Sequence, residues 1–225
     1  MTVVTPPLLI HMAAGGIGII TGAAALSVAK GQRLHRACGT LFFAALLIMS
    51  ATAVYLSIQL QPGTFFGSIL TFYLVATAWM TVRREPGTIG FFEKIAVFPA
   101  LFCAVGTMAL GIMAMKSPTG HFWGYPAPIH FFLTAVALTA ATGDVRLIRQ
   151  RGIAGRSRIT RHFWRMCFAF FEATSAFFIG KQKVFPMFLH GSPILIVLGV
   201  SPLVVMIFYF VRVRSTALVT PSRTL

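Results

Sequence analysis

The sequence predicts an all-α membrane protein in which seven helices cross the bilayer, with the N-terminus outside and the C-terminus in the cytoplasm. The chain is 57% hydrophobic and only 10% charged, and its mean hydropathy is +0.83. A soluble domain of this size could not cover so much apolar surface with so few charges. Apolar stretches recur along the chain, and the basic residues gather in alternate connections between them. These observations together predict a polytopic membrane protein.

Seven apolar stretches are long enough to cross a bilayer, which requires about 20 helical residues. They cover approximately residues 7–29, 37–60, 65–82, 91–115, 129–148, 162–180 and 189–211.

Proline, turn and basic residues along the chain support the predicted ends and bends of these helices, in order. Pro7 suits the first turn of the first helix, where a missing N–H costs nothing. The second helix ends at the turn signal of residues 61–63, and the third ends at Arg84. Pro99 predicts a kink or an irregular first turn in the fourth helix, and Pro202 predicts a bend in the seventh.

The basic residues determine the predicted orientation. Sixteen of the nineteen Lys and Arg lie in alternate connections, and only Lys116, Lys181 and Lys183 lie on the other side. The positive-inside rule therefore places the N-terminus outside. The net charge of +15 indicates topology and attraction to anionic lipid head groups. No block of basic and aromatic residues indicates nucleic-acid binding.

The domain organisation is simple. Residues 1–214 form one seven-helix transmembrane domain, and residues 215–225 are expected to be a disordered cytoplasmic tail.

A histidine followed by small residues at helical spacing recurs in the chain. It gives the sets His11, Gly15, Gly18, Gly22, Ala25 and His130, Thr134, Ala137, Ala141, Asp144. His162 begins a similar alanine-rich face, and His35 begins a weaker one. A face without large side chains lets another backbone or a flat ligand come close.

This repeat favours a haem hypothesis. Histidines from facing helices can bind haem iron axially, and small neighbours make room for the macrocycle. His11 and His130 would hold one haem b, and His35 and His162 a second. The outer pair, His11 and His130, and the inner pair, His35 and His162, would lie about 28 Å apart in untilted helices. That separation is long for direct electronic contact between two haems.

Two other readings of the histidines stay open. His11, His130 and His190 all begin odd-numbered helices, so they form a candidate zinc or copper site on the outer face. No carboxylate lies near that face to serve as a general base. Alternatively, the histidines are interfacial residues that cap helices or contact lipid phosphate.

Glu172 is the most unusual acid, because the sequence places it near the middle of the sixth apolar stretch. A carboxylate at such depth is expensive unless it is protonated, paired or facing water. Glu172 is therefore a candidate proton or ion site, with a protonated acid bound to a neighbouring helix as the structural alternative. Asp144 is expected to pair with Arg146 or Arg165.

Short motifs carry a resemblance to known proteins. They are His11, the run Thr21-Gly22-Ala23-Ala24-Ala25-Leu26, the segment His35-Arg36-Ala37-Cys38-Gly39, His162, and Thr174-Ser175-Ala176-Phe177. The chain resembles a bacterial family of polytopic membrane proteins whose domain has no assigned function. That resemblance implies a seven-helix fold in the bacterial inner membrane and no particular activity. The arrangement of the histidines is also similar to that of two-haem cytochrome b561-type proteins.

Two classes of function follow. The first is a haem b protein that transfers electrons across the membrane to a redox partner. The second is a protein without a cofactor, either a small transporter or a structural subunit of a larger membrane complex. The sequence contains no Walker loop, nucleotide fingerprint, serine nucleophile elbow or EF-hand loop.

Overall fold

The structure is a computed structural model that describes the backbone of residues 5–219 and the side chains of residues 5–211. Its long helices are α1 (Pro6–Ser27), α2 (Arg33–Gln59), α3 (Phe65–Arg83), α5 (Val97–Lys116), α6 (Ala127–Arg149), α7 (Gly155–Phe178) and α8 (Pro193–Val219). The short elements are η1 (Pro62–Thr64), α4 (Phe91–Ile95), β1 (His121–Phe122), β2 (Tyr125–Pro126), η2 (Gln182–Val184) and η3 (Met187–Leu189). Each predicted apolar stretch overlaps one long helix, and the fourth stretch also includes the short α4.

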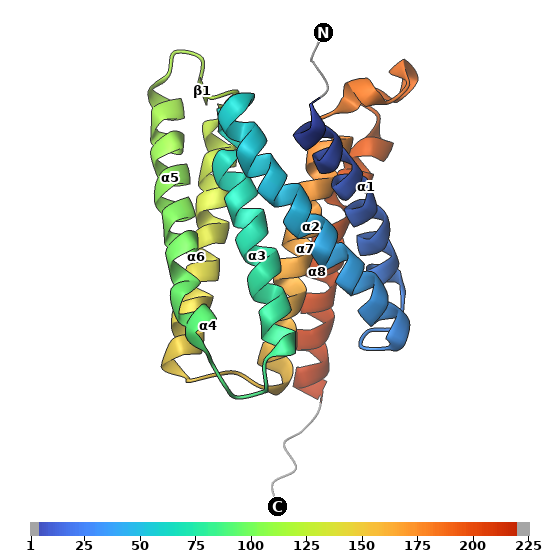
Figure 1. Cartoon of the computed structure of the whole chain (residues 1–225), viewed down its shortest axis with the longest axis vertical. Helices are drawn as coiled ribbons and strands as arrows, with labels where there is room; N and C mark the ends of the chain where they lie inside the picture. The colour runs from blue at the N-terminus through green and yellow to red at the C-terminus, as the bar shows by residue number, and fades with distance from the viewer. Residues whose placement is uncertain (1–4, 220–225) are drawn as a thin grey trace, which may run out of the picture.

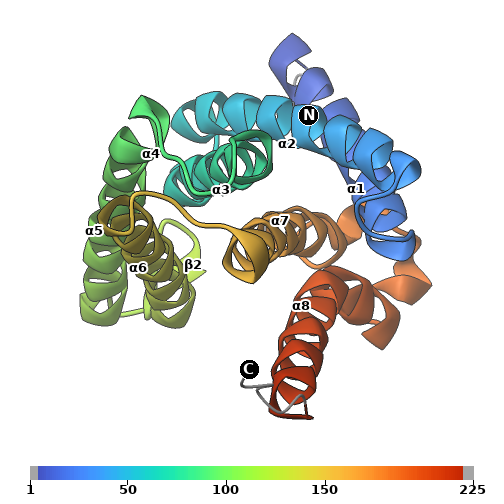
Figure 2. The ribbon, with the colours of Figure 1, turned by 90° about the horizontal axis from the view of Figure 1, so that it is seen from below.

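Six of these helices are long and apolar enough to cross a membrane. The exception is α7, whose arginines lower its hydropathy and which is strongly amphipathic. Figure 2 shows α7 near the centre of the bundle, where α1, α3 and α8 pack against it. Its buried polar side chains, Arg161, Arg165 and Thr174, face other helices. The protein is an all-α polytopic membrane protein.

Neighbouring helices pack as hairpins: α1 with α2, α5 with α6, and α7 with α8. The helix α3 joins them, because it packs against α2, α5 and α7. The start of α1 and the end of α8 lie at opposite ends of the bundle (Figure 1). That arrangement is the one expected of seven helices that each run the length of the bundle.

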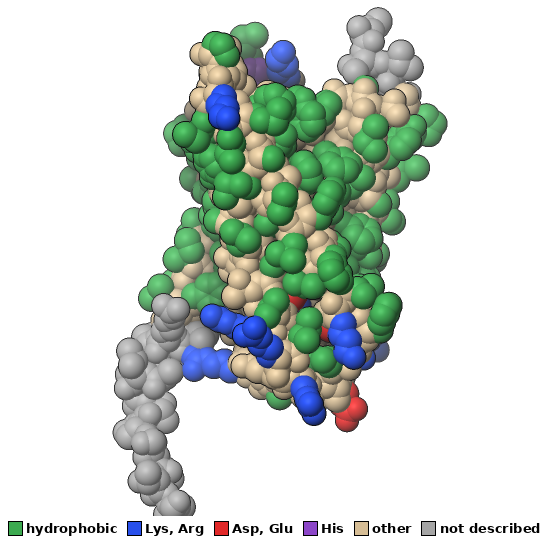
Figure 3. Space-filling view, turned by 90° about the vertical axis from the view of Figure 1, so that its left-hand side faces the viewer, with side chains coloured by type: hydrophobic (Ala, Val, Ile, Leu, Met, Phe, Trp, Pro, Cys, Tyr) green, Lys and Arg blue, Asp and Glu red, His purple; other side chains and the backbone are tan. Residues whose placement is uncertain are grey.

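The two ends of the bundle differ in charge. The α1–α2, α3–α4 and α6–α7 connections lie at one end, which we call the basic end, and the strands β1 and β2 lie at the other, the hairpin end (Figure 1). In Figure 3, hydrophobic side chains cover the middle of the face shown, and most Lys and Arg gather toward the basic end. This distribution matches a body that spans an apolar layer.

The fourth predicted helix is divided in the structure. The short α4 stops at Ile95 and α5 starts at Val97, so that Pro99 lies in the first turn of α5, where it breaks no helical hydrogen bond. Glu93 stabilises the start of α4, because it accepts hydrogen bonds from the Gly90 N–H at 2.8 Å and from Arg84 Nε at 2.6 Å. The charge pair thus holds the α3–α4 turn at the basic end.

Small residues in the helices are covered by phenylalanine rings. A Cβ at Gly22 of α1 would lie 2.8 Å from Phe42 and 2.9 Å from Phe170. Phe66 fills the same kind of space at Gly106, where the corresponding distance is 2.1 Å. The glycine-rich face of α1 is therefore packed against side chains of the same chain.

The predicted disordered tail, residues 215–225, overlaps the end of α8. The helix continues to Val219, so residues 215–219 are helical, and the rest of the predicted tail lies outside the described residues.

Candidate functional site: buried ionic groups of the bundle

The centre of the site is the carboxylate of Asp144 on α6, which is completely buried. Its Oδ1 atom lies 2.7 Å from Arg165 Nη2 and 2.6 Å from Arg161 Nη2, both on α7. Its Oδ2 atom accepts a hydrogen bond from the hydroxyl of Tyr73 on α3. Helical spacing explains the two arginines, because residues four apart lie on one face of α7. The network therefore joins three helices.

Arg165 is completely buried and almost fully partnered. It donates from Nη1 to the Thr77 hydroxyl and from Nη2 to the Ala140 carbonyl at 3.0 Å. Its guanidinium carbon lies 5.1 Å from the centre of the Tyr73 ring and 5.4 Å from that of Trp164. Only its Nε has no hydrogen-bond partner among the described residues. Such contacts are what an arginine needs inside a low-dielectric bundle.

Arg161 gives the network an excess of positive charge. It is nearly buried and donates from Nε to the hydroxyl of Thr81 at 3.1 Å. Two guanidinium groups therefore surround one carboxylate. An anion that reached this cluster would find a favourable potential.

Glu172 on α7 forms a second and separate polar site. Its Oε2 atom accepts a hydrogen bond of 2.5 Å from the hydroxyl of Thr71 on α3. Its Oε1 atom lies near Gly67 and the side chain of Leu133 is close by. No ion pair of Glu172 occurs among the described residues. The carboxyl group is therefore held by one neutral donor.

Glu172 and Asp144 lie at different depths along the bundle. Thr71 is six residues from the start of α3, and Glu172 is six residues from the end of α7. At 1.5 Å per residue, the pair lies about 9 Å inside the hairpin end. Asp144 is five residues from the end of α6, about 8 Å inside the basic end. The two carboxyl groups thus lie toward opposite ends of the bundle.

An apolar layer separates these two sites. Along α7, Ala169 lies on the face between Arg165 and Glu172, and it is completely buried. Leu74 of α3 and Ala137 of α6 belong to the same buried cluster and are also at 0% exposure. The described residues therefore give no continuous polar path between the sites.

All six histidines donate a ring N–H to a backbone carbonyl, because a carbonyl oxygen can only accept. The pairs are His11 with Met49, His35 with Ala25, His121 with Thr119, His130 with Phe122, His162 with Ala78 and His190 with Phe185, at 2.8–3.3 Å. Each such bond fixes one tautomer and leaves the other ring nitrogen as the acceptor. This arrangement suits a structural role and is also the usual orientation of a ligating histidine.

The structure does not bring the outer histidines together. His11 lies between α1 and α2, whereas His130 lies on α6, which packs chiefly against α5. His190 lies in the connection before α8. No group of three or more His, Cys, Asp or Glu side chains that could hold a metal ion occurs in the part of the chain that the structure describes.

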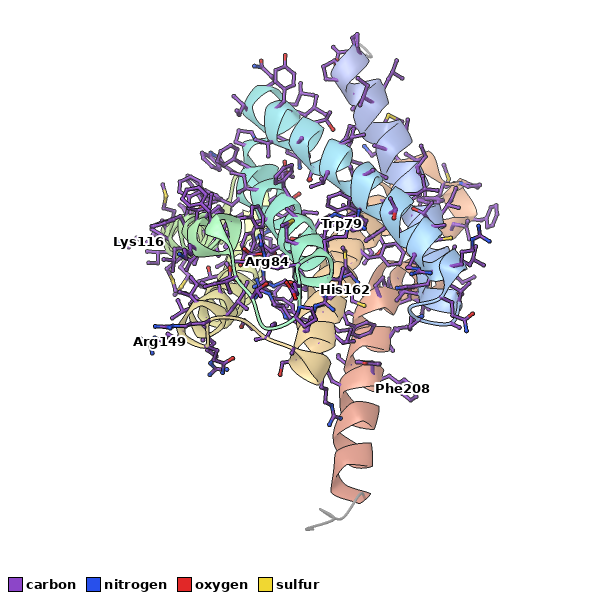
Figure 4. All side chains as sticks on the ribbon, turned by 60° about the horizontal axis from the view of Figure 1, so that its bottom comes forward. Trp79, Arg84, Lys116, Arg149, His162 and Phe208 are labelled. Atoms are coloured by element: carbon purple, nitrogen blue, oxygen red, sulfur yellow. The ribbon has the colours of Figure 1, made fainter. Side chains whose placement is uncertain are left out.

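The inner histidines, His35 near the start of α2 and His162 on α7, each bind the backbone of another helix. Figure 4 shows His162 and Arg84 near the basic end of α3. Both histidines donate from Nδ1, which leaves both Nε2 atoms as acceptors.

The sequence indicated only part of this site. The pairing of Asp144 with Arg165 is confirmed, whereas Arg146 is exposed and takes no part in the described ion pairs. Arg161, Tyr73 and Thr71 were missed. The four-residue spacing of Arg161 and Arg165 was the available signal for the first of them.

Comparisons of the chain with protein-family models, with curated proteins and with solved structures found no match.

Proposed function

We propose that this membrane protein is a small transport protein that moves protons through Glu172 and the Asp144 network. The observation that carries the proposal is the environment of Glu172, a carboxyl group inside the bundle with one hydroxyl partner and no cation beside it. A charged carboxylate is costly there, so the neutral acid is favoured until a proton acceptor or cation arrives. Such a group is suited to take up and release a proton.

Glu172 and the Asp144 network would form the two ends of a proton path that the buried apolar layer closes in this conformation. A proton from the hairpin end reaches Glu172, and the Asp144–Arg161–Arg165 network lies toward the basic end. The buried layer of Leu74, Ala137 and Ala169 separates them. Transfer therefore requires a movement of α7 against α3 that opens this layer to water, in the manner of alternating access.

The proposed orientation follows from charge. In the proposal all seven long helices cross the bacterial inner membrane, with α7 as the polar central helix. The basic end faces the cytoplasm and the hairpin end faces outward.

Proton movement into liposomes tests this function directly. The purified protein is reconstituted with a trapped pH dye, and a potassium gradient with valinomycin sets the membrane potential. We expect a potential-driven pH change that Glu172→Gln abolishes and that the exposed-residue control Glu85→Gln retains. An absence of flux from folded protein would reject proton transport and favour the structural-subunit reading.

A second candidate is a haem-binding electron-transfer protein, favoured by the Nδ1 bonds of His35 and His162, which leave both Nε2 atoms as acceptors. Their Nε2 atoms could serve as axial ligands, and a bound haem would supply one-electron chemistry. An absorption spectrum of protein expressed with haem, before and after reduction, tests this candidate. We expect a sharp reduced band that His162→Ala removes and the exposed-residue control His121→Ala retains. A featureless spectrum of folded protein would reject it.

A further inference from the structure

A long apolar groove runs along the side of the bundle between α6, α7 and α8. Its volume is about 380 Å³, and its lining is almost entirely apolar. The residues on α6 include Phe132, Ala135 and Thr139, and those on α7 and α8 include Trp164 and Phe210. Seen along the bundle, α6 lies to the left of the central α7 and α8 lies below it (Figure 2). The groove exists because α6 packs against α5 and diverges from α8.

Positive charge lies at the basic end of this groove. Arg146 is exposed and follows Thr139 by seven residues, so it falls within about 20° of Thr139 and Ala135 around α6. On α7, Arg161 lies one turn beyond Trp164 toward the same end, but its guanidinium is buried against Asp144 and Thr81, so the exposed charge on this side comes from Arg146. The groove thus has an apolar body and a cationic end.

The dimensions match a lipid of one leaflet. Arg146 and Phe132 are fourteen residues apart on α6, or about 21 Å at 1.5 Å per residue. Half of a bilayer measures about 20–22 Å from its midplane to the outer edge of the head groups. A lipid with its phosphate at Arg146 would therefore place the end of its chain at Phe132.

We infer that this groove binds one anionic phospholipid, with an acyl chain along α6 and the phosphate at Arg146. The charge at the basic end selects the anionic head group, and the apolar lining selects the chain. A second copy of this protein would bring another basic end against the first, which like charges disfavour.

Lipid retention in native mass spectrometry tests the inference. The full-length protein in mild detergent is mixed with equal amounts of phosphatidylglycerol and phosphatidylcholine. We expect one phosphatidylglycerol to remain bound to each chain. Ala135→Trp, which fills the groove, should lower this binding by about tenfold. The matched control Leu138→Trp, at an exposed position outside the lining, should leave it unchanged.

A second pair of measurements separates the head group from the chain. Arg146→Gln should reduce the preference for phosphatidylglycerol over phosphatidylcholine several-fold while the groove still holds a lipid. Thr139→Phe provides an independent block if Ala135→Trp does not fold. Equal lipid binding by the blocked variants and the Leu138→Trp control would overturn the inference. A dimer that dissociates when the groove is filled would overturn it as well, because the occupant would then be a second chain.

Discussion

Asp144 on α6 lies 2.7 Å from Arg165 on α7, and both side chains are completely buried. The pair bridges the α5–α6 hairpin and the central helix α7. With Tyr73 it also reaches α3. The pair therefore fixes how three helices are placed at the basic end.

Removing the charge of Asp144 should strongly destabilise the protein. Asp144→Asn keeps the shape of the side chain but leaves Arg161 and Arg165 buried without a counter-ion. We expect a loss of about 3–5 kcal/mol in the free energy of unfolding. Denaturant unfolding in detergent measures it, and Glu85→Gln, at an exposed position, should change stability by less than about 0.5 kcal/mol.

A double-mutant cycle tests whether Arg165 is the partner of Asp144. Asp144→Leu combined with Arg165→Leu removes both charges, so the double variant should be more stable than the sum of the two single effects predicts. Strictly additive effects would show that the two side chains do not interact in solution.

A methyl group on α1 should be tolerated at the exposed Gly16 but not at the packed Gly22. Gly22→Ala forces the Cβ atom against Phe42 and Phe170, and we expect a loss of about 1–3 kcal/mol from overpacking. Gly16→Ala, on the same helix, meets nothing within 4 Å and should be neutral or stabilising. Thermal unfolding in detergent compares them, and equal effects would contradict the packing of the two rings.

Lys30 should stabilise the end of α1. Its amine donates to the carbonyls of Ala25 at 3.2 Å and Val28 at 3.1 Å, and also to that of Leu26. Burial lowers the pKa of this amine, and the nearby Cys167 opposes that shift. Lys30→Met should lower stability by about 1 kcal/mol, because a cation at a helix C-terminus is lost. Lys94→Met, at an exposed position, is the control.

The orientation can be read from cysteine labelling. In a variant without the three native cysteines, Pro118→Cys places a thiol at the hairpin end and Glu85→Cys places one at the basic end. Both positions are exposed. In intact cells, a membrane-impermeant maleimide should label only Pro118→Cys, and permeabilised cells should show both. Labelling of Glu85→Cys alone in intact cells would reverse the proposed orientation.

The sequence alone determined the helices and their distribution of charge. Each apolar stretch of about 20 residues forms a long helix, with the fourth divided after Ile95, because hydropathy and helical hydrogen bonding act locally along the chain. The pairing of Asp144 with Arg165 could also be anticipated, since few opposite charges were available. The histidine pattern does not determine a ligand site, because helical spacing says which residues share a face and not what covers that face.

Only the tertiary structure decided which residues of different helices contact one another. It places Thr71 against Glu172, Phe42 and Phe170 over Gly22, and Ala78 beside His162. It also separates His11 from His130 by placing α1 and α6 in different hairpins. These relationships depend on the order and rotation of the helices, which are set by packing between residues far apart in the chain. No local pattern of hydropathy or charge contains that information.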